Sequence, residues 1–220
     1  MTNSSNPINT RSTVVDLVRH PLRDVVNDTK SRPFCGPMAV AAITGEPISR
    51  VRDAFRLVRH GEGWIHCKRA PAIMGTLTYE VERVLSIFGY VGSWRVVDDQ
   101  PTLAAWLEAR AGVERTHPLV VQVTGHWIAL SGWEFCDTRS RGRVVDAEEA
   151  PGRRKRVRRV FVITERCTPA AEIPTKTRTN MSVPNLKDRD VLAANAAMAR
   201  DRREIAGIAS SGAPSSRIPL

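Results

Sequence analysis

The sequence has no apolar run close to the roughly 18 residues that a membrane span needs, so we expect no transmembrane segment. Its polar start, residues 2–6, is not followed by the hydrophobic stretch of a secretory signal. Cysteines are few, and no two of them form a closely spaced pair. These absences predict a reducing, cytoplasmic setting and free thiols at Cys35, Cys67, Cys136 and Cys167.

A zinc-binding motif is missing as well. His60, His66 and Cys67 lie close together, but their spacing matches no standard zinc finger. A fourth ligand would have to come from a distant segment. We therefore expect no bound metal and no other cofactor.

Negative charge is scarce relative to positive charge: 33 Lys and Arg residues against 23 Asp and Glu give a formal net charge of +10. Much of the excess lies within residues 153–159. A solvated loop that leads into a strand is one interpretation, and weak binding of a polyanion is the other. Because no aromatic side chains alternate with these charges, base stacking on nucleic acid is not expected. The basic residues are Arg153, Arg154, Lys155, Arg156, Arg158 and Arg159.

The periodicity of apolar residues changes along the chain. The first half has mostly the spacing of helices, whereas the second half alternates or is rich in β-branched residues, as strands are. Helices followed by an antiparallel sheet predict an α+β fold. The expected helices cover 13–27, with an interruption at Pro21, and 35–44, 47–58, 77–88 and 101–111. The expected strands cover 93–97, 117–123, 126–131, 133–136, 143–145 and 157–164.

At 220 residues the chain is long enough for one sizeable core. We expect residues 1–12 to be disordered and residues 13–166 to form a single domain. Beyond them the composition shifts to Thr, Pro, Ala and Asn, which indicates an extended C-terminal arm over 167–220. A thin helical stripe near 186–209 would not fold alone, so we expect it to dock on the domain or on a protein partner.

Cys35 stands at a predicted helix start. It precedes Gly36 and Pro37, and a proline is tolerated in the first helical turn because no partner is needed there for its missing N–H. The apolar run over 38–43 predicts that this helix is buried. The positive end of the helix favours the thiolate, which is the nucleophilic form. Since a lone buried cysteine is usually inert, its role depends on a nearby base.

His126 is the candidate base, because it opens a predicted strand and an oriented imidazole can take the proton of a thiol. A turn at Ser131–Gly132 would fold the next strand back and bring Asp137 beside the histidine. A carboxylate there would fix the tautomer of the ring and stabilise the imidazolium. Asp146, at the end of a later strand, is the alternative third member, and we prefer Asp137.

Two segments carry a resemblance to a known superfamily: Cys35-Gly36-Pro37-Met38-Ala39-Val40-Ala41, and Gly125-His126-Trp127-Ile128-Ala129-Leu130 with Asp137-Thr138 behind it. They resemble the papain-like cysteine peptidases and are most similar to the bacteriocin-leader peptidase-like and phage-encoded members. The resemblance covers residues 20–165. It implies a papain-like fold, attack by Cys35, proton transfer by His126, orientation by Asp137 and an acyl-enzyme intermediate.

The resemblance implies a thiol hydrolase, either a peptidase or an amidase, that acts on protein or on the peptide of peptidoglycan. A phage-encoded member would act in the virion or in lysis. The alternative is a papain-like component of a phage particle or other assembly, weak or inactive in catalysis and anchored by residues 167–220.

One departure from the papain-like pattern concerns the oxyanion donor. Such enzymes usually carry a glutamine about six residues before the nucleophile, where its side chain supports the oxyanion. Thr29 occupies that position here, and Asn27 is the upstream amide that could substitute. The Cys-Gly-Ser-Cys-Trp signature of papain and cathepsins is also absent.

Overall fold

A six-stranded antiparallel sheet organises the part of the chain that the computed structural model describes, residues 20–169 and 172–176. The spatial order of its strands is β1-β6-β2-β3-β4-β5. Their bounds are β1 Tyr90–Val96, β2 Pro118–Val123, β3 His126–Ser131, β4 Glu134–Cys136, β5 Val145–Asp146 and β6 Val157–Arg166. All described residues fall within one of the two units into which the chain divides, Met1–Lys176.

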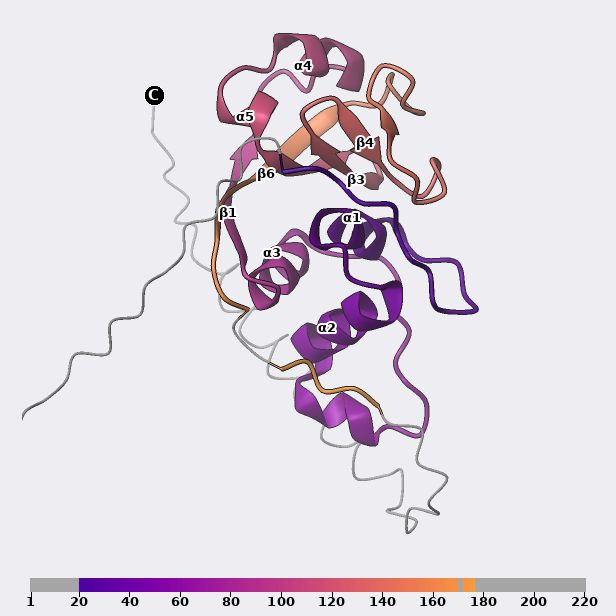
Figure 1. The fold of residues 1–220 in the computed structure, drawn as a ribbon. Helices are drawn as coiled ribbons and strands as arrows, with labels where there is room; N and C mark the ends of the chain where they lie inside the picture. The colour runs from indigo at the N-terminus through magenta and orange to yellow at the C-terminus, as the bar shows by residue number, and fades with distance from the viewer. Residues whose placement is uncertain (1–19, 170–171, 177–220) are drawn as a thin grey trace, which may run out of the picture. The chain divides into compact units, whose positions relative to one another are not determined.

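Helices cover both faces of the sheet (Figure 1). Three lie on one side and two short ones on the other, which confirms the α+β class expected from the sequence. The helices are α1 Cys35–Thr44, α2 Ile48–His60, α3 Thr78–Ile87, α4 Leu103–Ala109 and α5 Val113–Thr116, with a 3₁₀ turn η1 over Glu62–His66.

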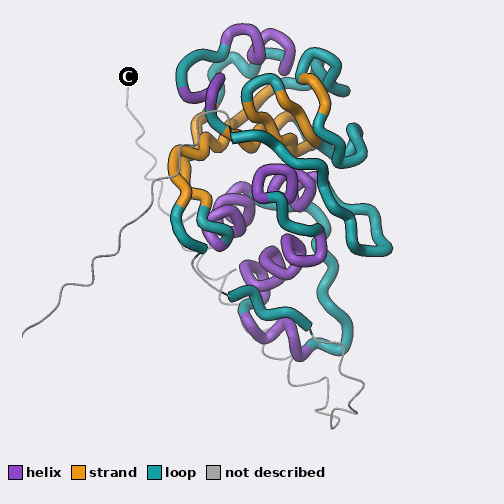
Figure 2. The backbone as a smooth tube through the Cα atoms, in the orientation of Figure 1, coloured by secondary structure: helices purple, strands orange, loops and turns teal. Residues whose placement is uncertain are grey.

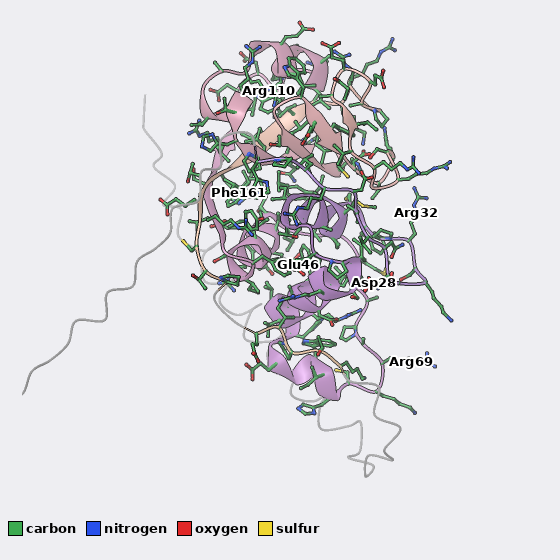
Figure 3. All side chains as sticks on the ribbon, viewed as in Figure 1. Asp28, Arg32, Glu46, Arg69, Arg110 and Phe161 are labelled. Atoms are coloured by element: carbon green, nitrogen blue, oxygen red, sulfur yellow. The ribbon has the colours of Figure 1, made fainter. Side chains whose placement is uncertain are left out.

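The strands carry nearly continuous apolar sequence because both faces of the sheet are buried. In β2, Val120 packs with the cluster of α1, α2 and α3, whereas Leu119 and Val121 pack with the cluster of α4. This alternation follows from the two-residue repeat of a strand. Two of the residues labelled in Figure 3 mark the two sides: Phe161 of β6 belongs to the first cluster, and Arg110 directly follows α4.

The helix α1 is buried from Gly36 to Thr44 and packs against β3. Gly36 is required by close contact, because a Cβ at this position would lie 2.2 Å from Oγ1 of Thr76. At the other end Gly45 takes a left-handed conformation, φ 74°, and its N–H donates to the carbonyl of Ala41. The predicted helix over 35–44 is therefore confirmed.

The segment before α1 differs from its prediction. Residues 20–34 form a loop with no helix (Figure 2), so the helix expected over 13–27 is wrong for the residues that are described. The 3₁₀ turn η1 and the short α5 have no counterpart among the predicted elements. The disordered start expected over 1–12 and the helix expected near 186–209 lie outside the described residues.

Several expected absences can be compared with the described residues alone. None of the helices in 20–169 and 172–176 is long and apolar enough to cross a membrane. All four cysteines are free thiols. Within the same residues, no group of three or more His, Cys, Asp and Glu side chains is placed to hold a metal ion.

A buried ion pair fixes the loop that contacts Gly36. Arg59 of α2 donates from Nε and Nη2 to the carboxylate of Glu80, at 2.6 and 2.8 Å. The same guanidinium donates to the carbonyls of Met74 and Gly75. Glu80 also accepts the N–H of Leu77 at 2.8 Å, so one carboxylate holds both the loop and the start of α3.

We expect Glu80→Gln to lower the free energy of unfolding by about 3 kcal/mol, because it leaves a guanidinium without its buried carboxylate. Burial raises the pKa of Glu80, but the bonds from Arg59 and Leu77 outweigh it and leave the pKa below its usual value. The contribution is therefore present at neutral pH and is lost as the pH falls through that lowered pKa. Urea unfolding at pH 7 measures the loss.

Glu46→Gln is the matched control, because it removes a carboxylate from the exposed pair with Arg50. We expect a change below about 1 kcal/mol there. Equal losses in the two variants would contradict a special role for the Arg59–Glu80 pair.

Candidate active site

Cys35 is the first residue of α1, and its half-buried thiol lies close to His126. Burial raises the pKa of this thiol, but hydrogen bonding to His126 and to the N–H groups of Trp127 and Gly36 lowers it further than burial raises it. The net result is a pKa below that of an ordinary thiol. The thiolate is therefore favoured where a helix start supplies unpaired N–H groups.

His126 begins β3, directly after the turn Thr124–Gly125 that joins it to β2. Gly125 has φ 67°, which a glycine adopts without strain. Nε2 of the ring is 2.8 Å from Oδ2 of Asp137, and the ring lies close enough to the thiol of Cys35 for each group to shift the pKa of the other. Burial lowers the pKa of His126, but Asp137 and Cys35 raise it above its usual value.

Asp137 follows β4 and is completely buried. Its Oδ1 accepts the N–H groups of Arg139 and Ser140, both at 2.7 Å, which leaves Oδ2 for the histidine. The N–H of Asp137 itself donates to Oγ of Ser140 at 3.1 Å. The carboxylate is thus held in one orientation by a turn of its own sequence.

These contacts determine the tautomer of His126. A carboxylate only accepts hydrogen bonds, so the proton of neutral His126 lies on Nε2, facing Asp137. The unprotonated Nδ1 is then the atom available to Cys35. This is the arrangement that a general base requires.

The alternative third member lies elsewhere. Asp146 is exposed on β5, where it pairs with Glu134, and its Oδ1 accepts the N–H of Glu148. The carboxylate that His126 contacts is that of Asp137, so the geometry favours Asp137 over Asp146.

Asn27 is exposed, and its amide takes part in a local turn. Its Oδ1 accepts the N–H and the hydroxyl of Thr29 at 3.1 and 2.8 Å, and its Nδ2 donates to the carbonyl of Ser31 at 3.4 Å. No contact between Asn27 and Cys35 is among its hydrogen bonds to described residues.

The basic segment splits into two groups. Arg153, Lys155 and Arg156 donate to the backbone carbonyls of Glu148, Thr124 and Gln100, respectively. The side chains of Arg154, Arg158 and Arg159 are exposed and make no hydrogen bond or ion pair with a described residue.

Two hollows lie next to residues of the candidate site. The larger has a volume of about 480 Å³ and includes Pro33, two residues before Cys35, and Thr138, which follows Asp137. Its lining residues are Val25, Asn27, Arg32, Pro33, Met38, Thr138 and Arg141. Arg32, labelled in Figure 3, lies on the loop that precedes α1. The smaller, about 210 Å³, is lined by Thr76, Leu77, Thr78, Gln122, Arg158 and Arg159.

Thr76 and Gln122 are residues of interest that sequence reasoning missed. Thr76 contacts Gly36, and its carbonyl accepts the indole N–H of Trp127 at 3.3 Å. Gln122 pairs with Trp127 across β2 and β3. The sequence did contain one signal for Gln122, which is a polar residue in an otherwise apolar strand.

Comparisons with known proteins give one likeness in structure. No family model matches the chain, and no curated protein sequence matches it. A crystal structure of a double glycine motif protease from an AMS/PCAT transporter, in complex with the leader peptide, is similar with a TM-score of 0.42 and 15% identity. The match covers 69% of this chain and 97% of that chain. At this level of similarity, neither the activity nor the ligand of that protease transfers to this chain.

The pKa of Cys35 can be tested in a protein that carries Cys67→Ser and Cys167→Ser. We expect iodoacetamide to alkylate Cys35 with a rate–pH midpoint below the value of about 8.5 for a free thiol. His126→Ala should move the midpoint upward, because burial still raises the pKa of the thiol while the imidazole that lowers it is gone. Cys136 is the internal control, since burial raises its pKa to about 12 and keeps it unlabelled. A midpoint that His126→Ala leaves unchanged would contradict the contact.

Proposed function

We propose that this protein is a papain-like thiol hydrolase that cleaves peptide or amide bonds, with Cys35 as nucleophile, His126 as base and Asp137 as the orienting carboxylate. The observation that carries the proposal is the group of Cys35, His126 and Asp137, in which His126 contacts the buried carboxylate of Asp137 and lies close enough to Cys35 for each to shift the pKa of the other. The thiol pKa is lowered and the imidazole pKa is raised within it. A thiolate beside an imidazolium is the reactive state of a cysteine hydrolase.

The reaction proceeds in two displacement steps. The Cys35 thiolate forms a bond to the carbonyl carbon of the substrate, and the electron pair of the C=O bond moves to oxygen. When the tetrahedral intermediate collapses, the C–N bond breaks and His126 donates its Nδ1 proton to the leaving amine. Water, deprotonated by His126, then attacks the thioester and releases the acid together with the Cys35 thiol.

Backbone N–H groups at the start of α1 are the oxyanion donors in this proposal. The N–H groups of Cys35 and Gly36 make no hydrogen bond to a described backbone carbonyl, and Pro37 has none to offer. The first intrahelical bond runs from Met38 to Phe34. The amide of Asn27 is engaged with Ser31, so the main chain replaces the missing upstream glutamine.

The substrate is a peptide, either within a protein or in the stem of peptidoglycan. The two hollows provide room for side chains beside the reacting carbonyl. The larger contains Pro33 and Met38, which offer apolar contact, together with Arg32 and Arg141.

The test is to incubate the reduced protein with a pool of peptides and with purified peptidoglycan, and to identify new termini by mass spectrometry. Protein alkylated beforehand with iodoacetamide is the control. We expect new termini from the untreated protein alone. The proposal would be contradicted if neither substrate were cut at any pH between about 5 and 9, the range in which Cys35 and His126 titrate.

The inactive structural alternative depends on residues 167–220, most of which lie outside the described residues. A Cys35 that alkylates no faster than Cys67 or Cys167 would favour that alternative.

A further inference from the structure

The smaller hollow is bounded by two cations and no acidic residue. Arg158 and Arg159 of β6 line it together with Gln122 of β2, whose side chain ends in an amide. The other lining residues are Thr76, Leu77 and Thr78. Its volume of about 210 Å³ exceeds that of a single water molecule, which occupies about 30 Å³ in the liquid.

A β-bulge explains why two consecutive arginines border one hollow. Gln122 pairs with Arg159, but Val123 pairs with Val157, so β6 has one extra residue at Arg158. Neighbouring side chains of a regular strand point to opposite faces. A bulge bends the strand and re-aims a side chain, which brings Arg158 to the same hollow as Arg159.

The hollow adjoins the candidate site through Thr76. That residue contacts Gly36, the neighbour of Cys35, and accepts the indole N–H of Trp127, the neighbour of His126. Gln122 faces Trp127 across the strand pair. A group bound in the hollow is therefore close to a substrate carbonyl held at Cys35.

The two guanidinium groups are available to a ligand. Neither guanidinium has a hydrogen bond or ion pair to a described residue, whereas those of Arg153 and Arg156 in the same segment donate to backbone carbonyls. A guanidinium binds a carboxylate through two parallel hydrogen bonds.

We infer that this hollow binds the acidic side chain of a peptide substrate, with its carboxylate on Arg158 and Arg159 and its second polar contact at Gln122. The inference rests on the proposed hydrolase function. It makes the basic segment a determinant of substrate choice near the cleaved bond rather than a general polyanion site.

The experiment compares cleavage of peptide pools in which one position is fixed as Glu, Gln or Lys and both ends are blocked. Blocking removes the terminal carboxylate, which would otherwise compete with the Glu side chain for the hollow. We expect the wild-type protein to prefer Glu over Gln at one position next to the cleaved bond by about tenfold in kcat/KM. The double variant Arg158→Gln/Arg159→Gln should lose this preference.

Arg154→Gln is the matched control, because it removes an exposed charge from the same segment but does not line the hollow. It should keep the preference for Glu. An absent preference for Glu, or an equal loss in Arg154→Gln, would overturn the inference.

A binding measurement separates this inference from the proposed function. In the Cys35→Ser protein, fluorescence anisotropy of labelled Glu and Gln pools measures peptide binding at the hollow in the absence of catalysis. Tighter binding of the Glu pool that depends on Arg158 and Arg159 supports the hollow even if no peptide is cleaved. Equal binding of both pools overturns it even if cleavage is observed.

Discussion

Cys35→Ser should leave the protein folded and reduce its peptide hydrolysis by about 10⁴-fold or more, which is the scale on which loss of a nucleophile is felt. The serine hydroxyl is close in size to the thiol, so packing at the start of α1 is preserved. Its pKa lies far above that of the lowered Cys35 thiol, and His126 therefore faces an alcohol rather than a thiolate. The measurements are kcat/KM on a peptide cleaved by the wild-type protein and the midpoint of urea unfolding.

Cys167→Ser is the control for this substitution, because Cys167 is a half-buried thiol outside the candidate site. It should retain the full rate. A Cys35→Ser protein as active as Cys167→Ser would mean that the hydrolysis comes from another group.

The elements around Cys35 were predictable because their signals are local. An Ala-rich run with proline in its first turn and glycine at its end specifies a buried helix over 35–44, whatever surrounds it. The hairpins of β2, β3 and β4 follow from glycine turns between apolar runs.

The loop over 20–34 was not predictable in this way. The apolar spacing over 13–27 suggested a helix, yet the backbone N–H groups of the loop bond to distant parts of the chain. Arg23 donates to the carbonyl of Ala42, and Val25 donates to that of Gly142. Partners so far away in sequence override a weak local helical preference.

The candidate site was predictable only in part, because some of its signals are local and others depend on distant contacts. The order of Cys35, His126 and Asp137 can be recognised from short motifs, but the choice between Asp137 and Asp146 depends on strand register. Cys136 pairs with Ala129, so Asp137 emerges beside the start of β3. The hollow at Arg158 depends on a bulge and on a contact between Gly36 and Thr76, neither of which leaves a periodic pattern in the sequence.

Asp137→Asn should reduce hydrolysis by about 10³-fold to 10⁴-fold, comparable to the loss expected when a triad histidine takes the wrong tautomer. The N–H groups of Arg139 and Ser140 both donate to one carboxylate oxygen, so they fix the amide oxygen of the asparagine at that position. Its NH₂ group then faces Nε2 of His126.

An NH₂ group donates, so Nε2 of His126 must accept and the ring proton moves to Nδ1. The nitrogen that faces Cys35 then no longer takes the proton of the thiol. The iodoacetamide profile provides the second measurement: the Cys35 midpoint should rise in Asp137→Asn as it does in His126→Ala, because both changes remove the imidazole as an acceptor.

Asp146→Asn is the matched control, since it makes the same chemical change at an exposed carboxylate that bonds only to the N–H of Glu148 among its described partners. It should leave both the rate and the midpoint unchanged. If Asp137→Asn kept the wild-type rate, the asparagine would have to place its oxygen on His126 and its NH₂ against the two backbone donors. The two N–H groups would then face an NH₂ group and lose the acceptor they have in the buried carboxylate. That arrangement should also lower the free energy of unfolding, which the same urea titration would reveal.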